Sequence, residues 1–342
     1  MGYTDFMLKT AECVTPNHPD KLCDRISDAI LDYCLSKDPN SRVAIETMGG
    51  HKAFAVFGEI TSVSTTLEDL KPEIANIISR ITETPKDELG NIQISVVAQS
   101  PEISQGVDTG GAGDQGIMVG YACNDNQSHI PQELYLARSL AKYLYDIYPV
   151  DGKTQITLDA DNQIDTVVTS FQHAKQADLI THIQDWLVSI HHPHIPTIHA
   201  NPAGDWDQGG FDADTGLTGR KLAVDNYGPQ IPIGGGAFSG KDATKVDRSG
   251  AYMARYLAVQ TLHQENAKEV LVKLAYAIGV AHPVMATAQI TMQDETTKSL
   301  DLDINNPELT PKGIIEKFNL TQPIFESTAM WGHFGNNFPW DK

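Results

Sequence analysis

The residues best suited to chemistry form one glycine-rich run, residues 234–242, which reads Gly-Gly-Gly-Ala-Phe-Ser-Gly-Lys-Asp. Because glycine has no side chain, the backbone N–H groups of such a run can close around an anion. Lys241 adds a point charge suited to phosphate, and Lys245 and Asp247 follow it, just before a predicted helix from Ser249. The run predicts an anion-binding turn at a helix N-terminus, and we call residues 234–242 the cradle.

Two other interpretations of the cradle exist on this stretch alone. Residues 235–241 fit the start of a Walker P-loop, but Asp242 stands where that motif needs a Ser or Thr hydroxyl for Mg²⁺. The approach, residues 227–232, contains two prolines and makes a poor buried strand. A true P-loop is therefore disfavoured, whereas a glycine-rich turn without a ligand stays open as an alternative.

Another group of chemically useful residues lies near the start of the chain. His18, Asp20 and Lys21 place an imidazole, a carboxylate and an ammonium within four residues. A carboxylate binds a hard cation and a lysine binds a phosphate oxygen, so the trio suits a metal–phosphate site. A polar helix start capped by Asp20 explains the same residues equally well. The helix itself is clear, because apolar residues recur at helical spacing from Ile26 to Cys34.

A second glycine-rich tract covers residues 201–221 and ends in Arg220 and Lys221, with Asp214 shortly before them. A short predicted strand at 222–225 separates this tract from the approach to the cradle. Two tracts of bare backbone, each followed by cations, predict two walls of one polyphosphate site.

The composition of the chain excludes several classes of protein. Its 342 residues allow roughly two or three domains, and its formal charge of −19 argues against a nucleic-acid-binding surface. The four cysteines form no C-x-x-C pair, which argues against a zinc site, and four cysteines in a chain of this length do not suggest a disulfide framework. The N-terminus does not resemble a signal peptide, and no apolar run approaches the roughly 20 residues of a membrane helix. We expect a cytoplasmic protein with no nucleic-acid or membrane partner.

The apolar periodicity predicts a mixture of helices and strands. Glu46 and Glu59 fall on two predicted strands, where a carboxylate is usually exposed and less often lines a site. The loop at 100–116 carries five glycines, and we interpret it as an active-site lid. No internal sequence repeat is visible. The later predicted helices are 66–81, 131–147, 176–190, 249–263 and a short one from 310, and the predicted strands are 43–46, 53–61, 92–98, 154–158, 163–170, 222–225, 270–278 and 286–291.

Several short motifs occur in one order along nearly the whole chain. In that order they are HPDK at 18–21, ISDA at 26–29, GAGDQG at 111–116, GLTGRK at 216–221, GGGAFSGKD at 234–242 and GHFG at 332–335. Together they resemble the motifs of the S-adenosylmethionine synthetase (methionine adenosyltransferase) family. Any one of them is a moderate signal, and all of them in order are a strong one.

The resemblance implies a fold of three similar α+β domains in a pseudo-threefold arrangement, at residues 1–105, 106–208 and 209–342. It implies a homotetramer built from dimers, with active sites at the dimer interface. The implied reaction converts ATP and L-methionine into S-adenosylmethionine. The tripolyphosphate that leaves is hydrolysed to phosphate and pyrophosphate, and Mg²⁺ and K⁺ are the implied cofactors.

The resemblance also implies a role for individual residues. Its catalytic residues would be His18, Lys21, Arg220 and Lys241. Asp20 and Asp247 would hold Mg²⁺, and Glu46 would serve a K⁺ site. ATP would contact His18, Asp151, Gly152, Lys153, Asp205, Trp206, Asp214, Arg220, Lys221, Ala237 and Lys241, and methionine would contact Glu59, Gln105, Asp114, Asp214 and Lys245.

The residue types agree with this chemistry. A thioether sulfur is a fair nucleophile without a general base, so catalysis must position the reactants and stabilise the tripolyphosphate leaving group. His18 is suited to stabilise the departing oxygen. Four departures from the family pattern matter. Asn17 stands where Gly is usual, and Asp205-Trp206 replace a usual Arg-Phe pair. The loop between Gln105 and Gly113 is shorter than in common bacterial members, and a C-terminal segment expected after Trp340 in longer members is not in this sequence.

Two rival functions fit the same cradle. One is another ATP-dependent phosphotransferase, which methionine-dependent release of both phosphate and pyrophosphate would exclude. The other is a catalytically silent regulatory subunit of the same fold. The presence of His18, Asp20, Lys241 and Asp247 argues against the silent subunit.

Overall fold

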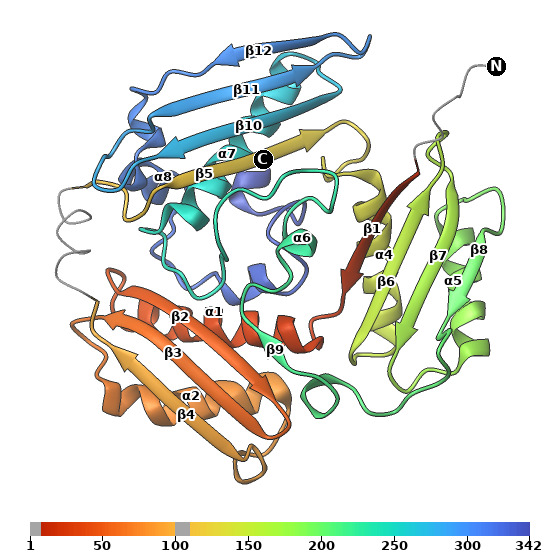
Figure 1. Cartoon of the computed structure of the whole chain (residues 1–342), viewed down its shortest axis with the longest axis horizontal. Coiled ribbons are helices and arrows are strands. Elements are labelled where there is room, and N and C mark those ends of the chain that lie inside the picture. Colours follow the sequence, from red (N-terminus) through yellow and green to blue (C-terminus); the bar gives the residue numbers. More distant parts are fainter. Residues whose placement is uncertain (1–7, 100–109) are drawn as a thin grey trace.

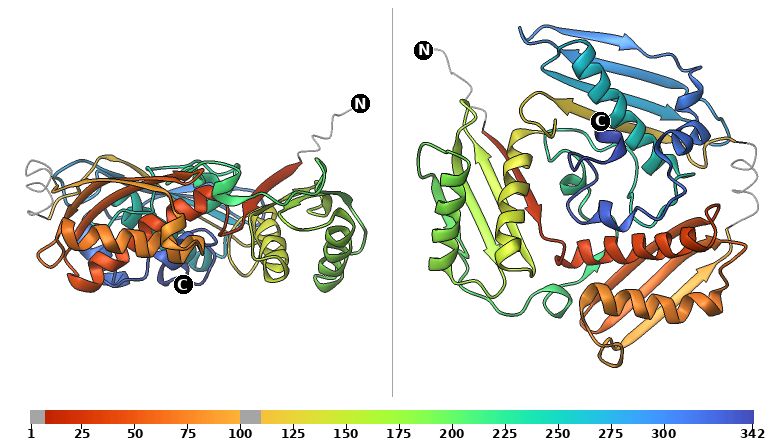
Figure 2. Two further views of the ribbon diagram at one scale, coloured as in Figure 1. Left: turned by 90° about the horizontal axis from the view of Figure 1, so that it is seen from below. Right: turned by 180° about the vertical axis from the view of Figure 1, so that it is seen from behind.

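The structure, a computed structural model, describes residues 8–99 and 110–342. Three four-stranded sheets with their helices surround the centre of the molecule (Figure 1). Seen edge-on and from behind, the sheets line one broad side and most helices cover the other (Figure 2). The predicted α+β fold of three similar domains is confirmed.

The first domain is built on a hairpin followed by a helix and a parallel strand. In β2, Val43 and Ile45 are buried under the helices, whereas Ala44 and Glu46 point to the other face, as the period of two requires. The hairpin turn places His51 and Lys52 at positive φ. The elements are β1 (Lys9–Val14), α1 (Pro19–Lys37), β2 (Arg42–Gly50), β3 (Ala53–Thr61), α2 (Leu67–Thr82), η1 (Lys86–Glu88) and β4 (Asn91–Val97).

The central domain repeats the same order of elements. Strand β7 pairs antiparallel with β6 and parallel with β8, as β3 does with β2 and β4. Helix α4 packs on β6, and its apolar face joins the central core around Trp186. The elements are β5 (Gly116–Cys123), α4 (Gln132–Ile147), β6 (Gly152–Leu158), β7 (Ile164–Phe171), α5 (Gln176–Ser189) and β8 (Thr197–Ala200).

The third domain departs from this order after its hairpin, because β12 returns antiparallel to β11 without an intervening helix. The C-terminal segment is packed into the core, where Trp340 stacks on Tyr252 and donates from Nε1 to the His333 carbonyl at 2.7 Å. The elements are η2 (Gly210–Asp212), β9 (Gly216–Leu217), α6 (Leu222–Asp225), α7 (Val246–Gln264), β10 (Glu269–Tyr276), β11 (Met285–Thr291), β12 (Thr297–Asp301), η3 (Pro307–Leu309), α8 (Pro311–Phe318), η4 (Glu326–Ala329) and η5 (Pro339–Asp341).

The three domains exchange strands in a cycle. Strand β1 leaves the first domain to pair with β6 of the central sheet, and β5 pairs with β10 of the third sheet. Strand β9 closes the cycle by pairing with β2 of the first sheet. The predicted domain boundaries at 105/106 and 208/209 remain a prediction. Each of the three sheets contains one strand whose residues belong to a neighbouring predicted domain.

Some predicted elements are wrong or incomplete. The short strand predicted at 222–225 is helix α6, because a four-residue apolar run has no period that separates helix from strand. Strands β1, β5, β8 and β12 were not predicted. In β12 every residue is exposed, so the apolar alternation that marks a half-buried strand is missing. The helix predicted from 249 begins at Val246.

Candidate active site

The two glycine-rich tracts meet along one edge of strand β2. Strand β9 pairs with Met48 and Gly49 at one end of β2. The end of the cradle binds the other end, where Ile45 N donates to the Gly240 carbonyl at 3.0 Å and Asp242 N to the Val43 carbonyl at 3.0 Å. The tracts touch directly, since a Cβ on Gly219 would lie 2.5 Å from Cβ of Ala237. The structure therefore brings the two predicted walls together.

A buried ion pair fixes the shape of the cradle. Gly240 has a φ of +82°, and a Cβ there would lie 1.9 Å from the Ile45 carbonyl oxygen, so only glycine fits. The Gly240 N–H donates to Asp28 Oδ1 at 2.8 Å. Arg248 forms a bidentate pair with the same carboxylate at 2.6 and 2.9 Å, and its Nη1 also donates to the carbonyls of Phe238 and Lys241. The fully buried guanidinium thus holds both ends of the turn.

Each lysine of the cradle region is paired with a carboxylate. Lys241 Nζ lies 2.5 Å from Asp247 Oδ2, and the other oxygen of Asp247 accepts from Gly236 N at 3.0 Å. Lys245 pairs with Asp242. Burial alone would raise the pKa of Asp242, but the ammonium of Lys245 and several hydrogen bonds lower it. Asp242 therefore stays ionised at neutral pH.

The other wall begins with His18, which caps helix α1. Its Nδ1 accepts from Asp20 N at 3.2 Å, so the neutral ring carries its proton on Nε2. Burial lowers the pKa of His18 to about 3, and the charges of Lys221 and Lys153 add to the shift. A neutral imidazole with a defined N–H donor results at physiological pH.

Asp20 connects His18 to the second glycine tract. Its buried carboxylate accepts from Leu217 N at 3.0 Å and from Lys221 Nζ at 2.6 Å, and Arg220 Nε lies 3.5 Å away. Burial opposes ionisation most strongly, but the hydrogen bonds from Lys221 and Leu217 N and the charge of Lys221 together outweigh it, so the pKa of Asp20 is lowered. We call His18, Asp20, Arg220 and Lys221 the His18 cluster.

Two cavities adjoin this cluster. The smaller cavity, of about 200 Å³, is lined by most of the predicted nucleotide-binding residues of the central domain. Its wall residue Asp151 accepts from Gly210 N at 2.9 Å, and the indole N–H of Trp206 is buried without a hydrogen-bond partner in the described residues. The lining residues are His18, Pro19, Asp151, Gly152, Lys153, Ser170, Trp206 and Asp214.

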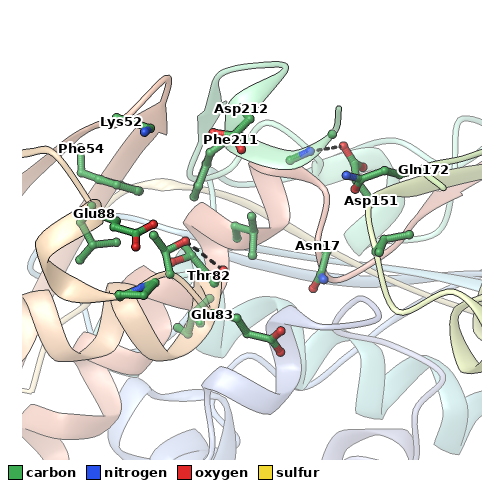
Figure 3. A pocket seen from close by; sticks show the side chains of 18 of the residues that line it. Asn17, Lys52, Phe54, Thr82, Glu83, Glu88, Asp151, Gln172, Phe211 and Asp212 are labelled. Carbon is green, nitrogen blue, oxygen red and sulfur yellow. Dashed lines mark hydrogen bonds between the residues drawn. The ribbon is translucent and has the colours of Figure 1, made fainter. Parts of the chain in front are cut away.

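The larger cavity, of about 460 Å³, shares Asp151 with the smaller one (Figure 3). The rings of Phe54 and Phe211 meet edge to face in its wall. Several carboxylates line it, and Lys52 is the one Lys or Arg among its described lining residues. A polyphosphate does not suit this acidic lining, so size does not identify the active site here.

Comparison with known proteins agrees with these motifs over the whole chain. The family models for the N-terminal, central and C-terminal domains of S-adenosylmethionine synthetase match residues 6–103, 109–206 and 208–342. The chain belongs to the S-adenosylmethionine synthetase family. The predicted resemblance is confirmed.

Named relatives support the same family. An S-adenosylmethionine synthase of Petrotoga mobilis is 39% identical, covering 98% of this chain and 96% of its own length. One of Borreliella afzelii is also 39% identical, covering 97% and 94%. A solved structure described as an unusual S-adenosylmethionine synthetase from Campylobacter jejuni has a TM-score of 0.84 at 32% identity, covering 98% of this chain and 96% of its own. The predicted enzyme class, a methionine adenosyltransferase, is confirmed.

Two residues that the family pattern places at ATP, Lys21 and Asp205, form contacts within the protein instead. Lys21 is 1% exposed, and its ammonium lies 3.0 Å from Asp24 and 2.5 Å from Asp225. It is therefore a buried counter-ion under the His18 cluster, and it has no access to a phosphate in this arrangement. Asp205 accepts from Gln176 N at 2.8 Å, at the first turn of helix α5, and does not line the small cavity.

Other predicted site residues lie on the open faces and edges of the structure. Glu46 and Glu59 lie on the exposed face of the first sheet, where Glu46 is opposite Phe57 and Glu59 opposite Ala44. Asp114 is exposed and accepts from its neighbour Gln115 N at 2.7 Å. None of the three carboxylates lines the small cavity. Gln105 and most of the predicted lid lie outside the described residues.

Some residues that build the site were missed by sequence reasoning. Asp28 was noted only as part of the ISDA motif, and its partner Arg248 was not singled out at all. They are 220 residues apart, so no local pattern indicates the pair. Asn17 was noted only as a departure from the family pattern. It ties the start of α1 to the central domain, because its amide donates to the Pro149 carbonyl at 3.0 Å and accepts from Tyr145 Oη at 3.1 Å.

The structure contains no ready-made metal cage in its described part, since no three His, Cys, Asp or Glu side chains there converge on one point. The residues present nevertheless fit Mg²⁺, which usually takes one or two carboxylates together with substrate phosphates. Asp20 and Asp247 are such carboxylates, and each now faces a lysine. Among the described residues, no helix is long and apolar enough to cross a membrane.

Proposed function

We propose that the His18 cluster and the cradle form the catalytic site of adenosyl transfer from ATP to L-methionine. In this reaction a lone pair of the methionine sulfur forms a bond to C5′, and the C5′–O bond breaks with its electrons on the tripolyphosphate. The tripolyphosphate is then hydrolysed to phosphate and pyrophosphate. The contact of the two glycine tracts at β2, beside His18, carries the proposal.

His18 acts on the departing oxygen as a neutral hydrogen-bond donor. Its Nδ1 accepts a hydrogen bond from Asp20 N, so the proton of the neutral ring is held on Nε2. A neutral donor strengthens its bond as negative charge develops on the oxygen, and this lowers the barrier more than it tightens substrate binding. No serine or cysteine nucleophile is required.

In this proposal the cations of both walls contact the polyphosphate. Arg220, Lys221 and Lys153 face it from the first wall, and Lys241 faces it from the cradle together with backbone N–H groups near Ala237. Trp206 stacks on the adenine, and Asp151, Gly152 and Asp214 complete the nucleoside pocket. Glu59, Gln105, Asp114, Asp214 and Lys245 are assigned to methionine.

Two metal ions complete the proposed site. Asp20 and Asp247 hold Mg²⁺, which offsets the charge of the phosphates when bound. Glu46 serves K⁺. Because Asp247 now holds Lys241, a divalent cation bound by Asp247 would leave the Lys241 ammonium available to a phosphate oxygen.

We also assign the open sheet faces to a homodimer interface. The face that carries Glu46 and Glu59 exposes the apolar side chains of Met48, Phe57 and Leu217, which is unusual for a surface that meets water. A second copy of the chain covers this face and brings the methionine-binding carboxylates to the partner's nucleotide pocket. Two such dimers form the homotetramer, and the enzyme works in the cytoplasm.

One experiment tests the function. Purified protein is incubated with ATP, L-methionine, Mg²⁺ and K⁺, and S-adenosylmethionine, phosphate and pyrophosphate are measured. We expect all three products in equal amounts, each dependent on methionine. Phosphate release without methionine and without S-adenosylmethionine would instead favour a different phosphotransferase.

A further inference from the structure

A pair of buried cations lies on helix α4 in a cavity separate from the two beside the His18 cluster. Arg138 and Lys142 are one turn apart, so both side chains lie on the same face of the helix. Arg138 is 3% exposed, and Lys142 is half-buried. Both line a cavity of about 280 Å³ between α4, residues 127–130 and Gly335 near the C-terminus.

The guanidinium of Arg138 is largely unsatisfied. Its Nη1 donates to the Phe334 carbonyl at 2.6 Å. Its Nε and Nη2 are buried and have no hydrogen-bond partner in the described residues. A charged donor that has lost its water and found no acceptor destabilises the folded state, so such groups normally have a partner.

Neither cation has a carboxylate within 4 Å in the part of the chain that the structure describes. Lys142 Nζ donates to Asn336 Oδ1 at 3.0 Å and lies over the ring of Trp331. The nearby acids are engaged elsewhere, because Asp225 pairs with Lys21 and Asp341 with Arg255. Burial lowers the pKa of Lys142, and the neighbouring charge of Arg138 lowers it further.

Two other buried cations of this chain, unlike Arg138 and Lys142, have carboxylate partners. Lys21 has two carboxylates within 3.0 Å, and Arg248 has a bidentate carboxylate. The cavity beside Arg138 contains neutral donors instead, and no acidic residue is among its described lining residues. These neutral groups belong to Gln127, Ser128, Tyr135 and Ser139.

We propose that this cavity binds an oxyanion of the size of phosphate, held by Lys142 Nζ beside the guanidinium of Arg138, since both residues line the cavity. The anion supplies the negative charge that the chain itself does not place there, and the cavity is large enough for it. Free inorganic phosphate and the phosphate group of a small monoester share this chemistry. The proposal does not depend on the function of the His18 cluster.

Binding is tested with inorganic phosphate by calorimetry at constant ionic strength, with sodium chloride as the replaced salt. The proposed function also gives the cradle a phosphate-binding role, so the measurement is made in a Lys241→Met background to weaken that site. We expect phosphate binding to persist there and to weaken about tenfold or more when Lys142→Met is added. Lys37→Met is the matched control, because Lys37 also lies on a helix over an aromatic ring but is exposed.

The proposal is overturned if the Lys241→Met protein binds no phosphate, or if adding Lys142→Met changes its affinity no more than Lys37→Met does. A direct measurement covers the case in which Lys142→Met does not fold. Wild-type crystals soaked in tungstate should show an anomalous peak inside this cavity, with a tungstate oxygen within hydrogen-bond distance of Lys142 Nζ. Density at the cradle alone would overturn the site.

The source of the anion is resolved by a second ligand. Glycerol 3-phosphate is titrated against the same variants beside inorganic phosphate. Equal, Lys142-dependent affinity for both indicates a site open to phosphate esters. Lys142-dependent binding of inorganic phosphate alone indicates a closed site that takes the free ion, and either result supports the oxyanion site.

Discussion

The His18 cluster and the region of the cradle present charge to a ligand in opposite ways. In the His18 cluster one carboxylate, Asp20, faces two cations, and the histidine is neutral, so the formal charge is +1. In the cradle region Lys241 and Lys245 each have their own carboxylate, so the formal charge is zero. The first wall can attract a polyphosphate as it stands, whereas the second must exchange an ion pair before its lysine can act.

The comparison extends to the carboxyl groups behind each wall. Asp24 lies beneath the His18 cluster, where it accepts from Gly219 N and Lys21, and burial raises its pKa to about 7. Asp242 lies behind the cradle, where Lys245 lowers its pKa. The His18 cluster, with its excess of cations, thus packs on Asp24, whose raised pKa favours protonation. The charge-balanced cradle region packs on Asp242, which stays ionised.

The largest expected effect tests the neutral donor of the first wall. His18→Ala should lower the rate of S-adenosylmethionine formation about 10²-fold or more, because a donor aimed at developing charge is lost. ATP binding should change little, since the donor acts mainly in the transition state. Single-turnover kinetics and equilibrium ATP binding separate the two. A near wild-type rate would remove His18 from the mechanism.

The second prediction concerns the balanced wall. Lys241→Met should lower the rate about 10-fold or more, because one charged contact to the phosphates is lost. Lys52→Met is the matched control, since it also removes one lysine charge but lies in the β2–β3 turn beside the larger cavity. Steady-state kinetics with ATP and methionine compare the two. Equal small effects would mean that the cradle does not contact the substrate.

The third prediction uses the raised pKa of Asp24. Between about pH 4 and pH 7 the folded protein binds a proton that the unfolded chain has lost, so the free energy of unfolding falls as the pH rises. The contribution to the slope is at most about 1.4 kcal/mol per pH unit. Asp24→Asn should remove this part of the slope in denaturant titrations from pH 4 to 7.

Asp212→Asn is the control for that titration, because it also removes one carboxylate but from an exposed position. If Asp24→Asn keeps the wild-type slope, the proton is held elsewhere around Lys21. Asp225 would then be the group to replace, since burial also raises its pKa.

The smallest expected effect on activity concerns Asp205, which the family pattern placed near the nucleotide. Its carboxylate instead accepts from the first turn of α5 and lies 3.5 Å from Lys175. Asp205→Ala should cost about 1 kcal/mol of stability through loss of this contact, while KM for ATP stays within about twofold. A large rise in KM with unchanged stability would restore Asp205 to the nucleotide site.

Sequence reasoning found the parts of the site that are local in the chain. The glycine runs, His18 with Asp20, and Arg220 with Lys221 are each visible within a few residues. It could not find that Lys21 is buried, because its carboxylate partner Asp225 is 204 residues away. The catalytic role that the resemblance implies for Lys21 stays a prediction, and the structure shows Lys21 buried against Asp24 and Asp225.

The fold was predictable where apolar periodicity is strong and where motifs indicate the family. Helices α1, α2, α4 and α5 follow the predicted spacing closely. The strand exchange was not predictable, because β1 and β5 pair with strands more than a hundred residues away and carry no mark of their partners. The two-residue strand β9 is shorter than any period that a sequence could show.

The cyclic strand exchange has a consequence for a chain made from its N-terminus onward. When β6 and β10 emerge from the ribosome, their exchange partners β1 and β5 already exist. The first sheet must wait, because the edge of β2 is covered only when residues 216–217 and 240–242 arrive. The first domain to be synthesised is thus closed only after the strands of the central sheet exist, and the segments that close it belong to the two glycine-rich tracts. A chain interrupted before residue 216 holds an open sheet edge and only part of the proposed nucleotide site, because Arg220, Lys221 and Lys241 are made later.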